Sequence, residues 1–157
     1  MRTMLLTSDP KGTIVNDNFQ FFENLTIGHT VVMGRNTFNS LLDGPLKRRC
    51  NIVLTRKITF SDRLKAFKFN LLNFGTSLKF IKDKNYVLDN YDYEPVFIIG
   101  GKDIFMLFEE YCDDMHLIKL DRIHQGLVTF NPSQVLWRIS SRKICEGKEI
   151  VYLTKKY

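Results

Sequence analysis

The residues best suited to chemistry lie where short apolar runs end in glycine or in a basic residue. The first such run is Val31-Val32-Met33-Gly34-Arg35-Asn36-Thr37, in which an arginine and a hydroxyl follow a predicted strand. A guanidinium at the start of a helix is typical of a site for a pyrophosphate or a ribose phosphate. A surface arginine and a helix-capping threonine would show the same residues, so this run alone leaves both interpretations open.

A second run, Ile98-Ile99-Gly100-Gly101-Lys102, places two glycines at the end of an apolar strand. Paired glycines let the backbone turn tightly and let a ligand approach it closely. The positive end of the helix predicted after them suits phosphate. Because the run lacks the G-x-G-x-x-G spacing, a purely structural turn remains the alternative.

The third run is Pro45-Leu46-Lys47-Arg48-Arg49-Cys50-Asn51-Ile52-Val53-Leu54-Thr55-Arg56, in which basic residues flank a predicted buried strand at both ends. Arg56 comes just after the carboxyl end of that strand, where open α/β sheets bind their ligands. An exposed arginine at a strand end would look the same in the sequence.

In this order and spacing, the three runs resemble the dihydrofolate reductase family. The family pattern is a strand ending in M-G-R-x-T-[WF], then P-L-x-x-R-x-N-I-V-L-[ST]-R, then V-x-I-I-G-G. The similarity covers nearly the whole chain except about residues 57–92. It implies hydride transfer from NADPH to 7,8-dihydrofolate, at the pterin C6, to give tetrahydrofolate.

The resemblance also implies a cofactor site. Arg35 and Thr37 would hold the phosphates, and Arg56 would lie beside the 2′-phosphate, which implies NADPH rather than NADH. The two glycines would let the pyrophosphate and the nicotinamide side approach the backbone. The full implied set is Thr7, Ile14, Gly34, Arg35, Asn36, Thr37, Leu54, Thr55, Arg56, Ile99, Gly100, Gly101, Lys102, Asp103 and Ile104.

For the substrate, Arg49 matches the family arginine that binds the carboxylate of the folate glutamate tail, a contact suited to a bidentate guanidinium. Apolar residues would line the pocket for the pterin and aminobenzoyl rings, and each of them would serve equally well as ordinary core. The implied substrate-binding set is Leu5, Leu6, Asn18, Phe22, Leu41, Leu46, Arg49, Ile99, Phe105 and Ile118.

The catalytic position departs from the family pattern. The family places a carboxylate four residues before the pocket phenylalanine, and counting back from Phe22 gives Asn18, with Asp17 next to it. Adjacent residues differ by about 100° around a helix, so either Asn18 takes that place or a slipped register restores Asp17. An amide has no titrating proton, and losing general-acid help typically costs about 10² to 10⁴-fold in rate.

Two more departures concern the same region. The loop after the first strand is short and lacks the family's Leu-Pro-Trp, and Ile118 stands where the family has a threonine paired with the acid. We therefore expect a dihydrofolate reductase that is slow. Alternatives are a protein that binds NADPH and folate without turnover, a structural protein (for example viral) on the same fold, and a riboflavin-pathway pyrimidine reductase. Arg49 and the Pro45-Leu46 pair favour folate.

An alternation of short strands and helices must position these residues, and it predicts an α/β protein. We expect strands at 3–6, 30–33, 51–54, 95–99 and 115–120, and helices at 18–26 and from 36–37 through 42. A further helix carries Ile104, Phe105 and Phe108 on its apolar face. Residues 60–92 suggest a strand near 67–69 and a helix near 76–82. Strands near 136–140 and 150–153 predict an antiparallel closing hairpin. With the resemblance, the fold class is a dihydrofolate-reductase-like, mostly parallel eight-stranded sheet with helices on both faces.

Composition narrows the remaining classes of function. A length of 157 residues with 44% hydrophobic residues predicts one domain, 1–157, with a core of its own. Three widely spaced cysteines argue against a disulfide framework, and with three scattered histidines they predict no metal site. A net charge of +6 without one basic block fits an anionic cofactor and substrate better than nucleic acid. With no membrane segment or signal peptide expected, we predict a cytoplasmic protein. If the protein is catalytically inactive, a protein partner becomes an alternative to the small-molecule ligands.

Overall fold

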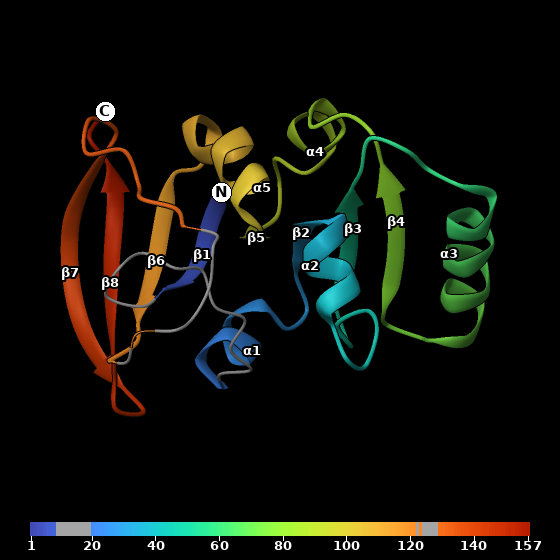
Figure 1. Cartoon of the computed structure of the whole chain (residues 1–157), viewed down its shortest axis with the longest axis horizontal. Helices are drawn as coiled ribbons and strands as arrows, with labels where there is room; N and C mark the ends of the chain where they lie inside the picture. The colour runs from blue at the N-terminus through green and yellow to red at the C-terminus, as the bar shows by residue number, and fades with distance from the viewer. Residues whose placement is uncertain (9–19, 122, 124–128) are drawn as a thin grey trace.

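The structure is a computed structural model that describes residues 1–8, 20–121, 123 and 129–157. Its centre is one sheet in the order β4-β3-β2-β5-β1-β6-β8-β7 (Figure 1). The eight strands in the described residues are β1 Arg2–Ser8, β2 Thr30–Gly34, β3 Cys50–Leu54, β4 Ser77–Ile81, β5 Val96–Gly100, β6 Asp114–Lys119, β7 Trp137–Cys145 and β8 Lys148–Lys155.

The pairing confirms the predicted sheet. β4, β3, β2, β5, β1 and β6 pair in parallel, whereas β8 runs antiparallel to both β6 and β7. The parallel strands are almost continuously buried, as sheets covered on both faces require. The last two strands form the predicted hairpin, closed by a turn at 146–147.

Short helices follow the strands. They are α1 Gln20–Thr26, α2 Arg35–Ser40, α3 Phe60–Leu72, α4 Asn85–Asn90 and α5 Lys102–Phe108, and a 3₁₀ turn at Glu109–Tyr111 follows α5. The predicted helices at α1, α2 and α5 are confirmed. α2 ends two residues earlier than predicted, because Leu41 adopts an extended conformation at its end. The predicted start of α1 at Asn18 lies outside the described residues.

Two predictions in residues 60–92 were wrong. Residues 67–69 belong to the helix α3 rather than to a strand, and residues 77–81 form the strand β4 rather than a helix. α3 begins with a capping box, in which Thr59 and Asp62 each accept a hydrogen bond from the other's backbone. β4 is fixed by its parallel pairing with β3, which buries Leu78 and Ile81. That pairing is a tertiary effect and overrides the local pattern.

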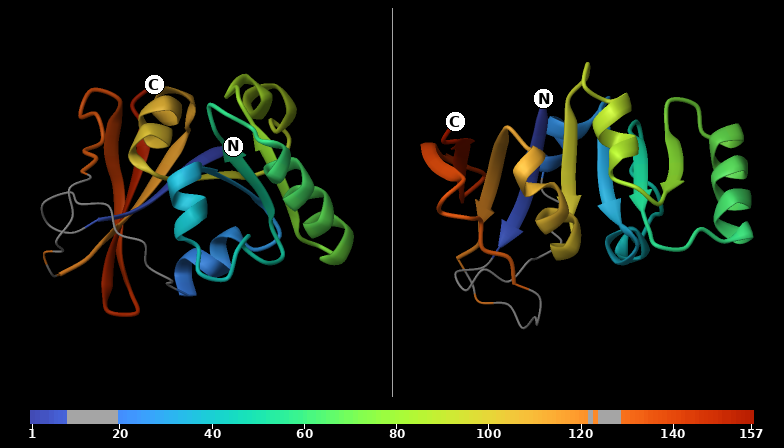
Figure 2. Two further views of the ribbon diagram at one scale, coloured as in Figure 1. Left: turned by 45° about the vertical axis from the view of Figure 1, so that its right-hand side comes forward. Right: turned by 90° about the horizontal axis from the view of Figure 1, so that it is seen from above.

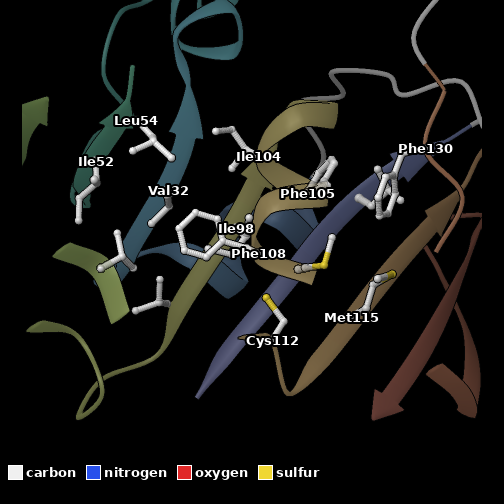
Figure 3. Packing of buried hydrophobic residues seen from close by; sticks show 14 of the residues in the cluster. Val32, Ile52, Leu54, Ile98, Ile104, Phe105, Phe108, Cys112, Met115 and Phe130 are labelled. Atoms are coloured by element: carbon white, nitrogen blue, oxygen red, sulfur yellow. The ribbon is translucent and has the colours of Figure 1, made fainter. Parts of the chain in front are cut away.

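Helices cover both faces of the sheet, as predicted. Successive residues of a strand point to opposite faces, so each strand supplies two clusters. Val32, Ile52 and Ile98 pack with Phe105 and Phe108 of α5 on one face (Figure 3). The alternate positions pack on the other face with α1 and α2, in a cluster that contains Leu5, Val31, Met33, Phe38, Val53, Leu78 and Phe97.

α3 lies beside β4 at the outer edge of the sheet (Figure 2). The Asn70 side chain completes the backbone bonding of that edge. Its Oδ1 accepts from the Leu78 N–H at 2.7 Å, and its Nδ2 donates to the Leu78 carbonyl at 3.1 Å. One amide thereby takes the place of a further strand and protects the open edge of β4.

Candidate active site

The sheet order places a crevice at the carboxyl ends of β2 and β5. These strands are neighbours, but the chain leaves β2 toward β3 and leaves β5 toward β6, in opposite directions across the sheet. Ligands of open α/β sheets bind at such a switch point. Gly34 and Gly100 end the two strands, so two of the sequence-predicted glycines lie side by side at this point.

Gly100 and Gly101 lie where any side chain would meet its neighbours. Gly100 has φ +111, and a Cβ there would lie 3.2 Å from the Phe105 ring. A Cβ on Gly101 would lie 3.4 Å from Thr37 Oγ1. A cis peptide bond joins the two glycines. The residues at the start of α2 and α5 are thus brought around bare backbone that a ligand can approach.

The Arg35 side chain is held by the element that the sequence did not predict. Its Nη1 and Nη2 donate to the two carboxylate oxygens of Asp62 at 2.6 and 2.7 Å, and Nη2 donates to the Lys57 carbonyl at 3.2 Å. Its guanidinium also lies 4.8 Å from the centre of the Phe80 ring. The hydrogen bonds from Arg35 lower the pKa of Asp62 far below its usual range, against the effect of burial. Asp62 was missed by the sequence analysis, although Thr59-x-x-Asp62 is a visible capping pattern.

The other predicted cofactor residues are spread along the same edge. Leu54 is buried, Thr55 is half-buried, and Arg56 is exposed just past β3. Arg35 Nη2 lies 3.5 Å from Thr55 Oγ1, which donates to the Lys57 carbonyl at 3.2 Å. Of the other residues predicted to bind the cofactor, Ile104 is buried and Ile99 is half-buried, whereas Asn36, Lys102 and Asp103 are exposed. Thr7 lies on β1 and pairs with Ile118 of β6.

Arg49 lies at the opposite end of β3 and is 6% exposed. Its Nε donates to Thr26 Oγ1 at 2.8 Å, and its Nη1 and Nη2 donate to the carbonyls of Lys47 and Glu23. Burial lowers the pKa of this guanidinium, with nearby Glu23 acting in the opposite direction. The side chain is therefore a fixed cation joined to the end of α1.

Asn51 is a buried positioning residue that the sequence analysis did not single out. Its Oδ1 accepts from the Leu46 N–H at 2.8 Å, and its Nδ2 donates to the carbonyls of Leu46, Arg49 and Ser77. These bonds tie the segment before β3 to β4. They fix the backbone on either side of Arg49.

The predicted substrate residues divide among three clusters. Leu5, Phe22, Leu41, Leu46 and Ile99 lie together on the face covered by α1 and α2. Leu6 and Phe105 belong to the cluster on the α5 face. Ile118 packs with Ile150, and Phe21 of α1 lies against them. Asp17, Asn18 and Ile14 lie outside the described residues.

A hollow of about 440 Å³ lies at the amino ends of β2, β3 and β4, away from the two glycines. Arg48, Arg49 and His29 contribute to its wall, together with Asn70 of α3 and Phe74, which follows that helix. Within the described ranges, no group of three or more His, Cys, Asp or Glu side chains is placed to hold a metal ion. In the same residues, no helix has the length and apolarity needed to cross a membrane.

Comparison with known proteins identifies several relatives. Dihydrofolate reductase of Staphylococcus aureus is 29% identical over 133 residues, which cover 84% of this chain and 72% of the relative. That of Ureaplasma parvum is 31% identical over 99 residues, or 63% and 56% of the two chains. The bifunctional dihydrofolate reductase-thymidylate synthase of Paramecium tetraurelia is 30% identical over 108 residues. That match covers 68% of this chain and 21% of the relative, so this chain spans only part of some relatives.

The fold has a close counterpart among solved structures. Dihydrofolate reductase from Enterococcus faecalis, complexed with NADP(H) and RAB-propyl, superposes with a TM-score of 0.79. The alignment covers 100% of this chain and 97% of the other at 19% identity, which shows a shared fold. The sequence model of dihydrofolate reductase matches residues 13–154, most of the chain. The chain therefore belongs to the dihydrofolate reductase family.

Proposed function

We propose that this protein reduces 7,8-dihydrofolate to tetrahydrofolate with NADPH as the hydride donor. The observation that carries the proposal is the bare backbone at Gly100 and Gly101, beside Thr37 and near Arg35, at the switch point of the sheet. Family membership and the relatives' names support the same activity. They favour it over a pyrimidine reductase.

The residues at this edge fit an anionic dinucleotide. A Cβ on either glycine would fill space that a pyrophosphate needs, and the hydroxyl of Thr37 lies 3.4 Å from that position at Gly101. Arg35, Thr55 and the exposed Arg56 would hold the phosphates. Arg56 would favour a cofactor that carries a 2′-phosphate, through charge attraction. When bound, NADPH supplies the hydride.

The site also fits an elongated substrate with an anionic end. Arg49 immediately precedes β3, and Gly34 pairs with Leu54, the last residue of β3. Arg49 and Gly34 are therefore separated by the length of this five-residue strand, or about 16 Å. The cluster of Leu5, Phe22 and Leu46 lies on the face that a ligand joining the two ends would cross. Arg49 would bind a carboxylate at one end while the pterin ring lies near Ile99. We assign the proton for the pterin N5 to Asp17 or to water.

The domain organisation and the cellular location are also part of the proposal. We propose that residues 1–157 form one domain, because a single sheet takes strands from both ends of the chain. We place the protein in the cytoplasm, and the free thiols of Cys50, Cys112 and Cys145 support a reducing compartment.

The first test is oxidation of NADPH by the purified protein, followed by absorbance with and without dihydrofolate. We expect turnover that depends on dihydrofolate, at a rate below that of relatives with the usual acid. NADPH binding without any turnover would contradict the proposal and favour a binding protein. Loss of both NADPH and folate binding would favour a structural role.

Two sets of variants test the assigned residues. Arg49→Leu should weaken folate-type ligands by about 2–5 kcal/mol and leave NADPH binding unchanged, and equal loss of both ligands would count against the tail assignment. Asp17→Ala should lower turnover far more than Asn18→Ala if Asp17 supplies the proton. Comparable turnover by wild type and Asp17→Ala would assign the proton to water.

A further inference from the structure

The outer face of α3 carries a regular apolar row that the fold does not cover. Phe60, Leu64, Phe67 and Leu71 follow each other at spacings of four, three and four residues. Their exposed fractions are 81, 41, 66 and 73%. Phe74 continues the spacing just past the helix and is fully exposed. We call these four helical residues the α3 seam.

The seam is not the face that holds α3 to the sheet. At about 100° per residue, its four members fall within about 60° of the helix circumference. The opposite side carries Ala66 and Phe69, which pack into the core cluster on the α1 and α2 face. Asp62 and Asn70 also bond inward, to Arg35 and to Leu78. α3 therefore has two apolar sides, and among the described residues only one of them packs against the rest of the chain.

One basic residue flanks the seam on each side. Arg63 flanks the row on one side and Lys68 on the other. Residues 56–84 contain eight lysines and arginines and two aspartates, a net charge of +6 that equals the charge of the whole chain. One of those aspartates, Asp62, faces inward and is paired with Arg35. The basic excess of this protein thus lies in the segment that contains α3. Lys65 lies over the Phe38 ring and Lys79 and Lys84 lie over other aromatic rings, so Arg63 and Lys68 are the bases that flank the seam.

We propose that the α3 seam binds an acidic amphipathic α-helix of a partner protein. Alternating spacings of three and four residues are those of a two-helix seam, in which flanking charges select the partner. A second copy of this chain would bring Arg63 and Lys68 against the same bases, which is unfavourable. The row is also narrower than the broad apolar face of helices that lie in a membrane surface.

The test uses a labelled synthetic helix of three heptads. Each heptad carries leucine at its first and fourth positions, which would contact the α3 seam, and glutamate at its fifth and seventh positions, which flank them. We expect it to bind the full chain in an anisotropy titration, at least tenfold more tightly in 50 mM than in 300 mM salt. A peptide with lysine at the flanking positions should bind at least tenfold more weakly. Charge reversal in Arg63→Glu/Lys68→Glu should invert this preference.

Apolar contact is tested with Phe67→Ser, which should weaken peptide binding at least tenfold. Ile144→Ser is the matched control, because Ile144 is 69% exposed on β7, at the far end of the sheet (Figure 1). It should bind the peptide like wild type. Neither substitution touches the proposed active site, so dihydrofolate-dependent turnover should be retained in both, which separates this proposal from the proposed function.

Three results would overturn the proposal. The first is equal binding of the glutamate peptide by wild type and Phe67→Ser. The second is a concentration-dependent dimer, seen by sedimentation, that Phe67→Ser abolishes while the peptide fails to bind. The third is seam-dependent binding to phosphatidylserine vesicles without peptide binding. The latter two would assign the seam to a second copy or to a membrane surface.

Discussion

Asp62 holds Arg35 through both of its carboxylate oxygens, at 2.6 and 2.7 Å, across 27 residues of sequence. The same carboxylate accepts the backbone N–H of Thr59 at 2.8 Å and so closes the capping box of α3. The proposed phosphate-binding arginine and the start of the edge helix therefore share one buried acid. Loss of that acid should affect both.

Asp62→Asn should destabilise the protein by about 1.5–3 kcal/mol, the usual value for hydrogen bonds to charged groups. The amide keeps one acceptor but turns an N–H toward the donors of Arg35 or Thr59. Urea unfolding followed by circular dichroism measures the loss. Asp89→Asn, at an exposed position on α4, is the matched control and should unfold like wild type. Equal midpoints for the two variants would show that the pair adds little.

The pH dependence of stability should also report this pair. Arg35 depresses the pKa of Asp62 in the folded protein, so the charged carboxylate is favoured by folding. Its contribution is complete above the unfolded value of about 3.9 and is lost as the pH falls through the folded pKa. Wild type should therefore lose stability more steeply than Asp62→Asn below about pH 5. Parallel stability curves from pH 6 to pH 3 would argue against the assignment.

The strands that end in glycine, β2 and β5, were predicted from the sequence, because buried apolar runs and the glycines that follow them are local signals. The prediction failed in residues 67–81 for a physical reason. Phe67 and Phe69 suggest alternation between two faces, yet both lie on a helix that is apolar on two sides. The strand β4 depends on pairing with β3 and on Asn70, neither of which a local pattern contains. The Arg35–Asp62 pair joins residues that are 27 positions apart, so no local sequence pattern predicts it.

Asn70 provides a test of how the sheet edge is protected. Asn70→Ala should remove both bonds to Leu78 and cost about 1–3 kcal/mol, because a backbone donor and acceptor lose their partners. Amide exchange at Leu78 should become at least tenfold faster. Asn73→Ala is a matched control, since the Asn73 side chain donates to the Phe69 carbonyl of α3 and makes no bond to β4 among the described residues. Unchanged exchange at Leu78 in Asn70→Ala would exclude this role.

Gly100→Ala should damage both stability and turnover. A residue other than glycine is strained at φ +111, and the added Cβ would lie 3.2 Å from the Phe105 ring. We expect a loss of about 2 kcal/mol or more. Gly147→Ala is the control for strain alone, because Gly147 has φ +76 with open space around its Cβ position in the distant hairpin. It should lose about 1 kcal/mol and keep its activity.

The contact between Gly100 and Phe105 can be separated from the backbone strain by a double-mutant cycle. Phe105→Leu removes the ring that the new Cβ would meet, so Gly100→Ala should cost less in that background than in wild type. The strain at φ +111 remains in both backgrounds and cancels in the comparison. Urea unfolding of the four proteins gives the coupling energy. Strict additivity would mean that the ring moves aside freely and that backbone conformation alone demands glycine at this edge of the site.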